Sequence, residues 1–333
     1  MEIDKERLIQ IIENFNTKNI AVVGDFCLDE YIYGTAQSLS PEAPIPRVVI
    51  DSVEYVPGAA GNIASGVRAL GAETYSCGVI GRDRSGEILK KALEEKGIYI
   101  SGMIIDKNRN TPTYSRIVAN GKQGQQLIRF DLENVEGIHK RSIDRIIKHV
   151  EQESSRTNAV IFADYDEVGT GLLEERFLKF LLNFSRENKI LSVGMSRRNL
   201  DRFYGFGLLT LNEREVQNIL GDGMKAADLE RTGRKLVERL DSNIVLTKGE
   251  KGVSAFGRAG EIYHLPSFAK DVLDVTGAGD SLTAAITLSL VSGANLEEAV
   301  YIGNHAAAIA ISKPGTTSVK PGEIKDRILA YER

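Results

Sequence analysis

Residues 274–280 read Asp-Val-Thr-Gly-Ala-Gly-Asp, a glycine-rich turn that runs into a small-residue segment, 281–290, which predicts a helix. Backbone N–H groups of such a turn and the positive end of the helix dipole converge on one point and favour an anion there. Asp280 places a carboxylate at that point. A base beside an oxyanion cradle is what phosphoryl transfer to a hydroxyl requires. The alternative is that Asp280 only caps the helix.

On either side of this segment, apolar runs alternate with amphipathic segments. The apolar runs predict buried strands at 20–23, 74–80, 159–163, 190–193, 208–211 and 244–247. The amphipathic segments predict helices at 60–70, 84–96, 140–153, 172–187, 225–240, 280–292 and 296–312. This alternation is typical of an α/β fold in which helices cover both faces of a parallel sheet.

Two stretches break the rhythm, because residues 47–55 and 113–131 alternate apolar with polar side chains. Asn120-Gly121 is a hairpin-turn signal inside the second stretch. Strands with one exposed face fit poorly in a buried parallel sheet. They predict a small projecting sheet, either a lid over a site or a dimer contact, with strands within about 31–56 and 101–131. Without a low-complexity linker or an internal repeat, residues 1–333 are expected to form one domain.

Composition excludes some classes of function. The formal net charge of −4 gives no electrostatic case for a nucleic-acid partner. No apolar run approaches the roughly 18 residues of a membrane span, and the acid-rich start does not resemble a signal peptide. A cytoplasmic location without a membrane partner is therefore expected. Cys27 and Cys77 are expected to be buried thiols, and the four histidines (His139, His149, His264 and His305) are expected to be structural.

Polar residues follow two of the predicted strands. Asn212 and Glu215 come directly after 208–211, at a strand end where α/β proteins bind ligands. Their oxygens suit magnesium held through water, but the same pair would also form a helix capping box. Residues 247–252 follow the next strand and turn through Gly249 and Gly252, as either a nucleotide-binding turn or a plain hairpin. This segment does not match a Walker A motif.

Four motifs carry a family resemblance. Residues 23–29 (VGDFCLD), 57–62 (PGAAGN), 212–215 (NERE) and 274–280 (DVTGAGD) occur in this order and together resemble the ribokinase-like (PfkB) carbohydrate kinases over nearly the whole chain. Residues 40–44 (SPEAP) and 125–131 (QQLIRFD) resemble the heptose-7-phosphate kinase branch, which makes ADP-heptose precursors. The resemblance implies a doubly wound α/β core with a small β-sheet lid. It also implies ATP as phosphoryl donor, Mg²⁺, and a sugar or sugar phosphate as acceptor.

The resemblance also implies roles for individual positions. Asp280 would be the catalytic base, with the backbone of Gly277, Ala278 and Gly279, together with Thr276, as the anion hole. The nucleotide would lie against Asn212, Glu213, Arg214, Glu215, Thr247, Lys248, Gly249, Gly252, Thr276 and Asn304, with Glu215 near the metal. The sugar would contact Asp29, Gly58, Asn62, Arg129 and Asp131. Asp274 and Gly315 would line a monovalent-cation site, and the lid would join two chains in a homodimer. Structural or solvated roles remain open for Gly58, Lys248, Arg129 and Asp131.

The chain departs from that branch after two middle strands and in the turn at 57–62, where Pro-Gly-Gly-Ala-Ala-Asn is altered at Ala59 and Gly61. The branch carries Asp-Tyr-x-Lys-Gly and Asp-Pro-Lys, whereas residues 164–169 read DYDEVG and 193–198 read VGMSRR. Lysines are natural phosphate ligands, so Arg197 and Arg198 either replace them or are exposed basic residues. Other possible functions are a kinase for another small sugar, polyol or nucleoside, and a non-catalytic paralogue. A dinucleotide-dependent oxidoreductase is disfavoured because no G-x-G-x-x-G follows the first strand.

Overall fold

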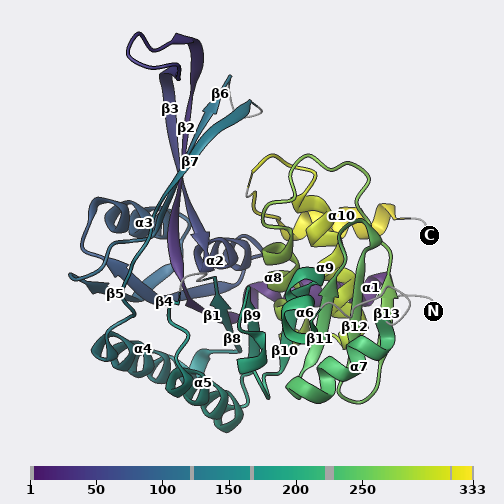
Figure 1. The fold of residues 1–333 in the computed structure, drawn as a ribbon. Coiled ribbons are helices and arrows are strands. Elements are labelled where there is room, and N and C mark those ends of the chain that lie inside the picture. Colours follow the sequence, from purple (N-terminus) through teal and green to yellow (C-terminus); the bar gives the residue numbers. More distant parts are fainter. Residues whose placement is uncertain (1–3, 121–123, 166–168, 222–228, 316, 332–333) are drawn as a thin grey trace.

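A mostly parallel sheet of nine strands forms the centre of the molecule (Figure 1), in the order β13-β12-β11-β10-β9-β8-β1-β4-β5. The computed structural model describes residues 4–120, 124–165, 169–221, 229–315 and 317–331. The pairings β11–β12 and β12–β13 at one edge are antiparallel. The strands are β1 (Asn19–Gly24), β4 (Glu73–Gly81), β5 (Tyr99–Asp106), β8 (Ala159–Asp164), β9 (Leu191–Ser196), β10 (Leu208–Asn212), β11 (Asn243–Thr247), β12 (Val253–Phe256) and β13 (Ile262–Leu265).

Helices cover both faces of this sheet. On one face, a hydrophobic cluster joins the strands to buried residues of six helices. These are α1 (Lys5–Glu13), α2 (Ala60–Ala69), α3 (Arg84–Glu95), α8 (Ala278–Val291), α9 (Leu296–Ala310) and α10 (Pro321–Ala330). On the opposite face, a second hydrophobic cluster joins the strands to buried residues of α4 (Lys140–Gln152), α5 (Glu175–Asn188), α6 (Glu213–Leu220) and α7 (Leu229–Leu240). Every helix in the described residues is too short or too polar to span a lipid bilayer.

The strand β1 shows why the apolar runs predicted this arrangement correctly. Ile20 and Val22 point into one hydrophobic cluster, and Ala21 and Val23 point into the other. Side chains alternate along a strand, so only a strand buried on both faces needs a continuous apolar run. The doubly wound α/β class is therefore confirmed, and each of the six predicted strands lies in this sheet.

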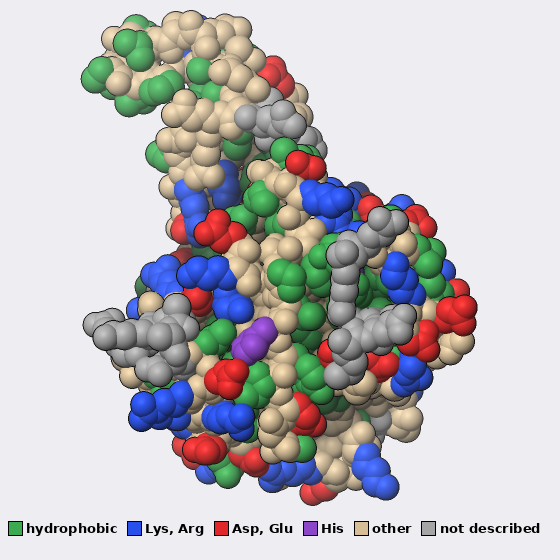
Figure 2. All heavy atoms as spheres, turned by 90° about the vertical axis from the view of Figure 1, so that its right-hand side faces the viewer, with side chains coloured by type: hydrophobic (Ala, Val, Ile, Leu, Met, Phe, Trp, Pro, Cys, Tyr) green, Lys and Arg blue, Asp and Glu red, His purple; other side chains and the backbone are tan. Residues whose placement is uncertain are grey.

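A second sheet of four strands projects from the body as the predicted lid (Figure 1). Its order is β3 (Pro46–Ala59), β2 (Phe26–Leu39), β6 (Thr113–Ala119) and β7 (Gln125–Leu132). The β2–β3 pair is much longer than the β6–β7 pair, so its tip extends furthest from the body. Figure 2 shows hydrophobic side chains at this tip, where Leu39 and Ile45 are exposed.

The structure corrects several predicted boundaries. The lid strands β6 and β7 lie within about 101–131 as predicted, although β5 in the same range belongs to the main sheet. The other lid range, 31–56, is too narrow, because β2 starts at Phe26 and β3 ends at Ala59. The helix predicted at 172–187 begins only at Glu175, and the Leu172 N–H ahead of it donates to the Asp25 carboxylate. β6 and β7 pair antiparallel, as a hairpin requires, with Asn120 in the left-handed region. Gly121, residues 166–168 and the start of the helix predicted at 225–240 lie outside the described residues.

One histidine is buried in a cluster of aromatic rings. His305 on α9 is fully buried against the rings of Phe268, Tyr301 and Tyr331, with ring centroids 4.4, 4.8 and 5.4 Å away. Neither of its ring nitrogens has a hydrogen-bond partner among the described residues. Burial, helped by the charges of Arg327 and Lys5, lowers the pKa of His305 to about 3. His305 therefore stays neutral in the folded protein and has the structural role expected for it.

This burial predicts a specific acid sensitivity. Below pH ~6.5 the unfolded chain protonates His305 while the folded protein does not, so stability falls as the pH drops from there toward about 3. The His305→Leu variant should lose this dependence. As the pH falls from 6 to 4.5, the free energy of unfolding of wild type should drop relative to that of His305→Leu by up to ~1.4 kcal/mol per pH unit. Urea denaturation at several pH values measures this difference, and parallel stability curves would contradict it.

Candidate active site

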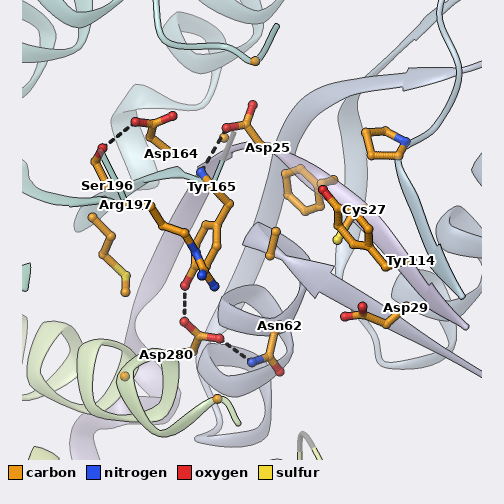
Figure 3. A pocket seen from close by; sticks show the side chains of 18 of the residues that line it. Asp25, Cys27, Asp29, Asn62, Tyr114, Asp164, Tyr165, Ser196, Arg197 and Asp280 are labelled. Carbon is orange, nitrogen blue, oxygen red and sulfur yellow. Dashed lines mark hydrogen bonds between the residues drawn. The ribbon is translucent and has the colours of Figure 1, made fainter. Parts of the chain in front are cut away.

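A cavity of about 630 Å³ lies where the carboxyl ends of the central strands meet the lid. Its lining includes residues at the ends of β1, β8, β9 and β10, at the start of α8, and on the lid strands β2, β6 and β7. Figure 3 shows Asp280 and Asn62 on one side of this space and Asp29 with Tyr114 on another. The predicted residues Asn212, Glu215, Thr247, Thr276, Gly277, Gly279, Asp280, Asp29, Asn62, Arg129 and Asp131 all line it.

The carboxylate of Asp280 is held at the start of α8 by two donors from other elements. Asn62 Nδ2, in the first turn of α2, donates to Oδ2 at 2.5 Å. The Tyr165 hydroxyl, just past β8, donates to Oδ1 (Figure 3). Burial raises the pKa of the Asp280 carboxyl above its ordinary value, against these two hydrogen bonds and the charge of Arg197, which lower it. A base with a raised pKa is better suited to take a proton from a hydroxyl.

The glycine-rich turn before α8 provides room for an anion. Gly277 precedes the helix with φ of +77°, a left-handed conformation that favours glycine. A Cβ added at Gly279 would meet nothing within 4 Å, so the space beside this residue is open. Two of the predicted anion-hole amides are already engaged, since Thr276 N–H donates to Asp274 Oδ1 at 2.9 Å and Ala278 N–H to Val275 O at 3.3 Å. Gly277 and Gly279 are thus the best placed for an anion.

Asn212 and Glu215 form the capping box at the start of α6, and both also line the cavity. The Glu215 N–H donates to Asn212 Oδ1 at 3.0 Å, and the Asn212 N–H donates to Glu215 Oε2 at 2.9 Å. Burial raises the pKa of Glu215 despite the Asn212 hydrogen bonds and the Arg197 charge. In the described residues no three or more His, Cys, Asp or Glu side chains gather to hold a metal. A single carboxylate fits a magnesium ion held through water and nucleotide phosphates.

The remaining predicted nucleotide residues lie outside the cavity lining. Residues 248–252 form the turn of the β11–β12 hairpin, and a Cβ at Gly252 would lie 2.1 Å from Leu265 O. Asn304 is buried, and its Nδ2 donates to Pro266 O at 2.8 Å. Within the described part of the chain, the residues predicted for the site but not lining the cavity are Glu213, Arg214, Lys248, Gly249, Gly252, Ala278, Asn304 and Gly58.

Charged side chains cover the lid wall of the cavity. Asp29 and Arg116 form an ion pair with Oδ1 and Nη1 2.7 Å apart, and both side chains are mostly buried. Arg129 pairs with Asp131 at 2.7 Å and stacks over the Tyr114 ring at 4.6 Å. Tyr114 pairs with Asp29 on one side and Asp131 on the other, so these three side chains share one face of the lid. Arg116 and its partner Arg129 lie two positions along the same strands and therefore share that face, which lines the cavity.

Two further predicted residues, Gly58 and Asp274, have clear structural surroundings. A Cβ at Gly58 would lie 2.4 Å from Asp29 Oδ2 and 2.5 Å from Cys27 Sγ, so this glycine gives Asp29 its space. Asp274 accepts hydrogen bonds from the Thr276 and Gly315 amides at 2.9 and 3.1 Å. Burial raises the pKa of Asp274, but these hydrogen bonds outweigh it and leave the pKa below its ordinary value. Asp274 and Gly315 are therefore neighbours, as the cation-site prediction requires.

The sequence interpretation did not assign Tyr165 or Arg116 to the site. Tyr165 directly follows β8, so the rule that selected Asn212 after β10 would have selected it as well. Arg116 occupies a polar position of an alternating lid strand, on the same face as Tyr114. Of the two arginines weighed as lysine replacements, Arg197 lines the cavity and Arg198 does not.

A doubly wound sheet with a carboxylate, an open glycine turn and a polar lid around one cavity defines a site of the phosphotransferase kind. A family model described as pfkB family carbohydrate kinase matches residues 17–322. The chain belongs to this family and is a sugar kinase.

Similar proteins agree with this assignment. Bifunctional protein HldE from Geobacter metallireducens is 36% identical over 309 residues, which is 92% of this chain and 62% of that protein. The protein of the same name from Geobacter sulfurreducens is 34% identical to this chain, with the same coverage of both proteins. The chain thus spans about three fifths of the length of these relatives.

Solved structures share the fold. Phosphofructokinase-2 from Escherichia coli in complex with potassium has a TM-score of 0.76 at 17% identity and covers 94% of this chain and 98% of its own. Ribokinase from Arabidopsis thaliana complexed with ribose and ATP has a TM-score of 0.72 at 16% identity, with coverages of 95% and 99%.

The Tyr165–Asp280 hydrogen bond leads to a prediction about pH dependence. The Tyr165 hydrogen bond lowers the pKa of Asp280, so the Tyr165→Phe variant should raise it. The acidic limb of the kcat/KM profile, where the base becomes protonated, should then move up by about one pH unit. A profile from pH 4.5 to 8 for both proteins measures this shift, and an unmoved acidic limb would contradict the assigned hydrogen bond.

Proposed function

We propose that this protein transfers the γ-phosphoryl group of ATP to a hydroxyl of a sugar or sugar phosphate, as a heptose-7-phosphate kinase-like enzyme. The observation that carries the proposal is the Asp280 carboxylate at the start of α8, beside the open space at Gly279 and inside a cavity closed by a charged lid. The relatives named Bifunctional protein HldE support the heptose branch.

Each part of the cavity has a role in this reaction. Asp280 takes the proton of the acceptor hydroxyl, whose oxygen attacks the γ-phosphorus. The amides of Gly277 and Gly279 and the start of α8 stabilise negative charge on the phosphoryl group. Glu215 and Asn212 would hold a magnesium ion through water, and such an ion would supply positive charge beside the nucleotide phosphates. A monovalent cation near Asp274 and Gly315 would support the turn before α8.

The acceptor lies at the lid end of the cavity. Asp29 accepts hydrogen bonds from sugar hydroxyls, and Asn62 bridges the sugar to the base. Arg129 and Asp131 contact the acceptor from β7. The arginines at the cavity wall support a phosphorylated acceptor despite the missing lysines, because arginine also binds phosphate. The arginines proposed for the acceptor phosphate are Arg109, Arg116 and Arg129.

The assay that tests this function is ADP release across a panel of acceptors. Heptose 7-phosphate, other sugar phosphates, free sugars, polyols and nucleosides are each supplied with MgATP. We expect turnover with heptose 7-phosphate, and a loss of roughly 10²–10⁴-fold in kcat for Asp280→Asn without loss of folding. Turnover only with another acceptor would redirect the proposal to that sugar, polyol or nucleoside. ATP binding without any turnover would indicate a non-catalytic paralogue.

We propose that two copies pair through the outer face of the lid. The row Val53, Ile32, Ile117 and Ile128 crosses the sheet on the face opposite Arg116, and Phe130 follows on the same face. Val53, Ile128 and Phe130 expose 41%, 54% and 50% of their surface. An exposed apolar face of this kind is typical of a protein–protein contact. A second copy supplies a self-complementary apolar partner.

The Phe130→Glu variant should therefore be monomeric while wild type is dimeric, because a carboxylate in the apolar contact would lose its water. Light scattering coupled to size exclusion measures the mass. Val135→Glu is the matched control, since Val135 is 96% exposed outside the lid strands and its change should leave the dimer intact. A monomeric wild type, or a dimer that survives Phe130→Glu, would contradict this pairing.

A further inference from the structure

Arg197 lines the same cavity as Asp280, the proposed base, and Glu215, the residue proposed for the metal. Arg197 directly follows β9, lines the cavity and is exposed to it. Its Cζ lies 5.1 Å from the centroid of the Tyr165 ring. Figure 3 shows the side chain extending along Tyr165 toward the Tyr165–Asp280 hydrogen bond. The positive charge of Arg197 lowers the pKa of both Asp280 and Glu215.

The backbone of Arg197 is held on two sides. Its N–H donates to Asp164 O on β8 at 3.3 Å, and its carbonyl accepts from Asn218 Nδ2 on α6 at 3.3 Å. The Tyr165 ring beneath it is fixed in turn, because Tyr165 N–H donates to the Asp25 carboxylate at 3.1 Å. One aromatic side chain therefore orients both the base, through its hydroxyl, and the guanidinium, through its face.

We propose that Arg197 is a catalytic residue that binds the oxygens of the phosphoryl group during its transfer from ATP to the acceptor, and that Tyr165 positions it. This inference rests on the proposed kinase function. The migrating group must pass between Asp280, which receives the acceptor proton, and the nucleotide end marked by Asn212 and Glu215. A planar guanidinium presents paired N–H donors that match phosphate oxygens, and it stays charged throughout.

The step balances without a further reactant. The acceptor O–H bond breaks and its proton goes to Asp280, while the acceptor oxygen forms a bond to the γ-phosphorus. The bond from that phosphorus to the oxygen bridging the β-phosphate breaks, and ADP leaves with the electron pair. Arg197 exchanges no proton and contributes its charge and its hydrogen bonds.

A competing role for Arg197 is to bind a phosphate already present on the acceptor. The two roles differ in kinetics. A ligand of the migrating group acts in the transition state, so its loss lowers kcat for phosphorylated and unphosphorylated acceptors alike. A ligand of the acceptor phosphate acts in the ground state as well, so its loss raises KM for phosphorylated acceptors alone.

The experiment compares Arg197→Ala and Arg197→Lys with the matched control Arg198→Ala, whose side chain does not line the cavity. We expect Arg197→Ala to lower kcat by roughly 10²–10³-fold with every acceptor used by wild type, with a smaller loss for Arg197→Lys and none for Arg198→Ala. Binding of a non-hydrolysable ATP analogue, measured by calorimetry, should change less than about threefold, since uniform binding is retained. Added guanidinium ions should restore part of kcat to Arg197→Ala only.

Three outcomes would overturn the inference. An unchanged kcat in Arg197→Ala would remove this residue from the reaction, and a rise in KM confined to phosphorylated acceptors would assign it to acceptor binding. A wild-type protein without turnover on the whole acceptor panel would reject the kinase function itself and this role with it. An active wild type with an unaffected Arg197→Ala variant rejects only the role of Arg197.

Discussion

The site depends on one constraint, which is that a carboxylate must be kept at the start of α8 with a raised pKa. Burial alone favours its neutral form, and the hydrogen bonds from Asn62 and Tyr165 limit that effect. One donor comes from α2, which packs against the sheet, and the other from the residue that follows β8, a strand within the sheet. The geometry of the base is thus set by how α2, α8 and β8 meet, and core packing and chemistry are coupled at this point.

Small residues make that meeting possible. A Cβ at Gly66 of α2 would lie 3.7 Å from the Ala284 Cβ of α8, an ordinary contact that shows how closely the two helices approach. A Cβ at Gly303 of α9 would lie 2.5 Å from Ile286 Cγ1, so a larger side chain there would push α9 from α8. The small-residue composition of α8 reads as a simple buried helix, but it also fixes where Asp280 stands.

The sequence predicted the parts of the fold that follow a simple periodicity. Continuous apolar runs located the six central strands, because a strand buried on both faces has no other pattern. The prediction missed β5 because Tyr99–Asp106 lies at the sheet edge and mixes exposed with buried positions, so it has no continuous apolar run. It also missed β12 and β13, which are only four residues long and follow a hairpin turn.

The sequence predicted individual site residues but not the contacts between them. Motifs located Asp280, Asn62 and Glu215 on their own elements, yet nothing in a linear pattern says that Asn62 donates to Asp280 across 218 positions. The same limit applies to the missing lysines. A motif comparison counts their absence as a lost phosphate ligand, whereas the position of Arg197 over Tyr165 shows a cation present at the end of β9. Phosphate recognition depends on where the hydrogen-bond donors lie and not on the neighbouring sequence. When a motif lysine is missing, the position of a nearby arginine in the structure therefore decides whether a phosphate ligand is present.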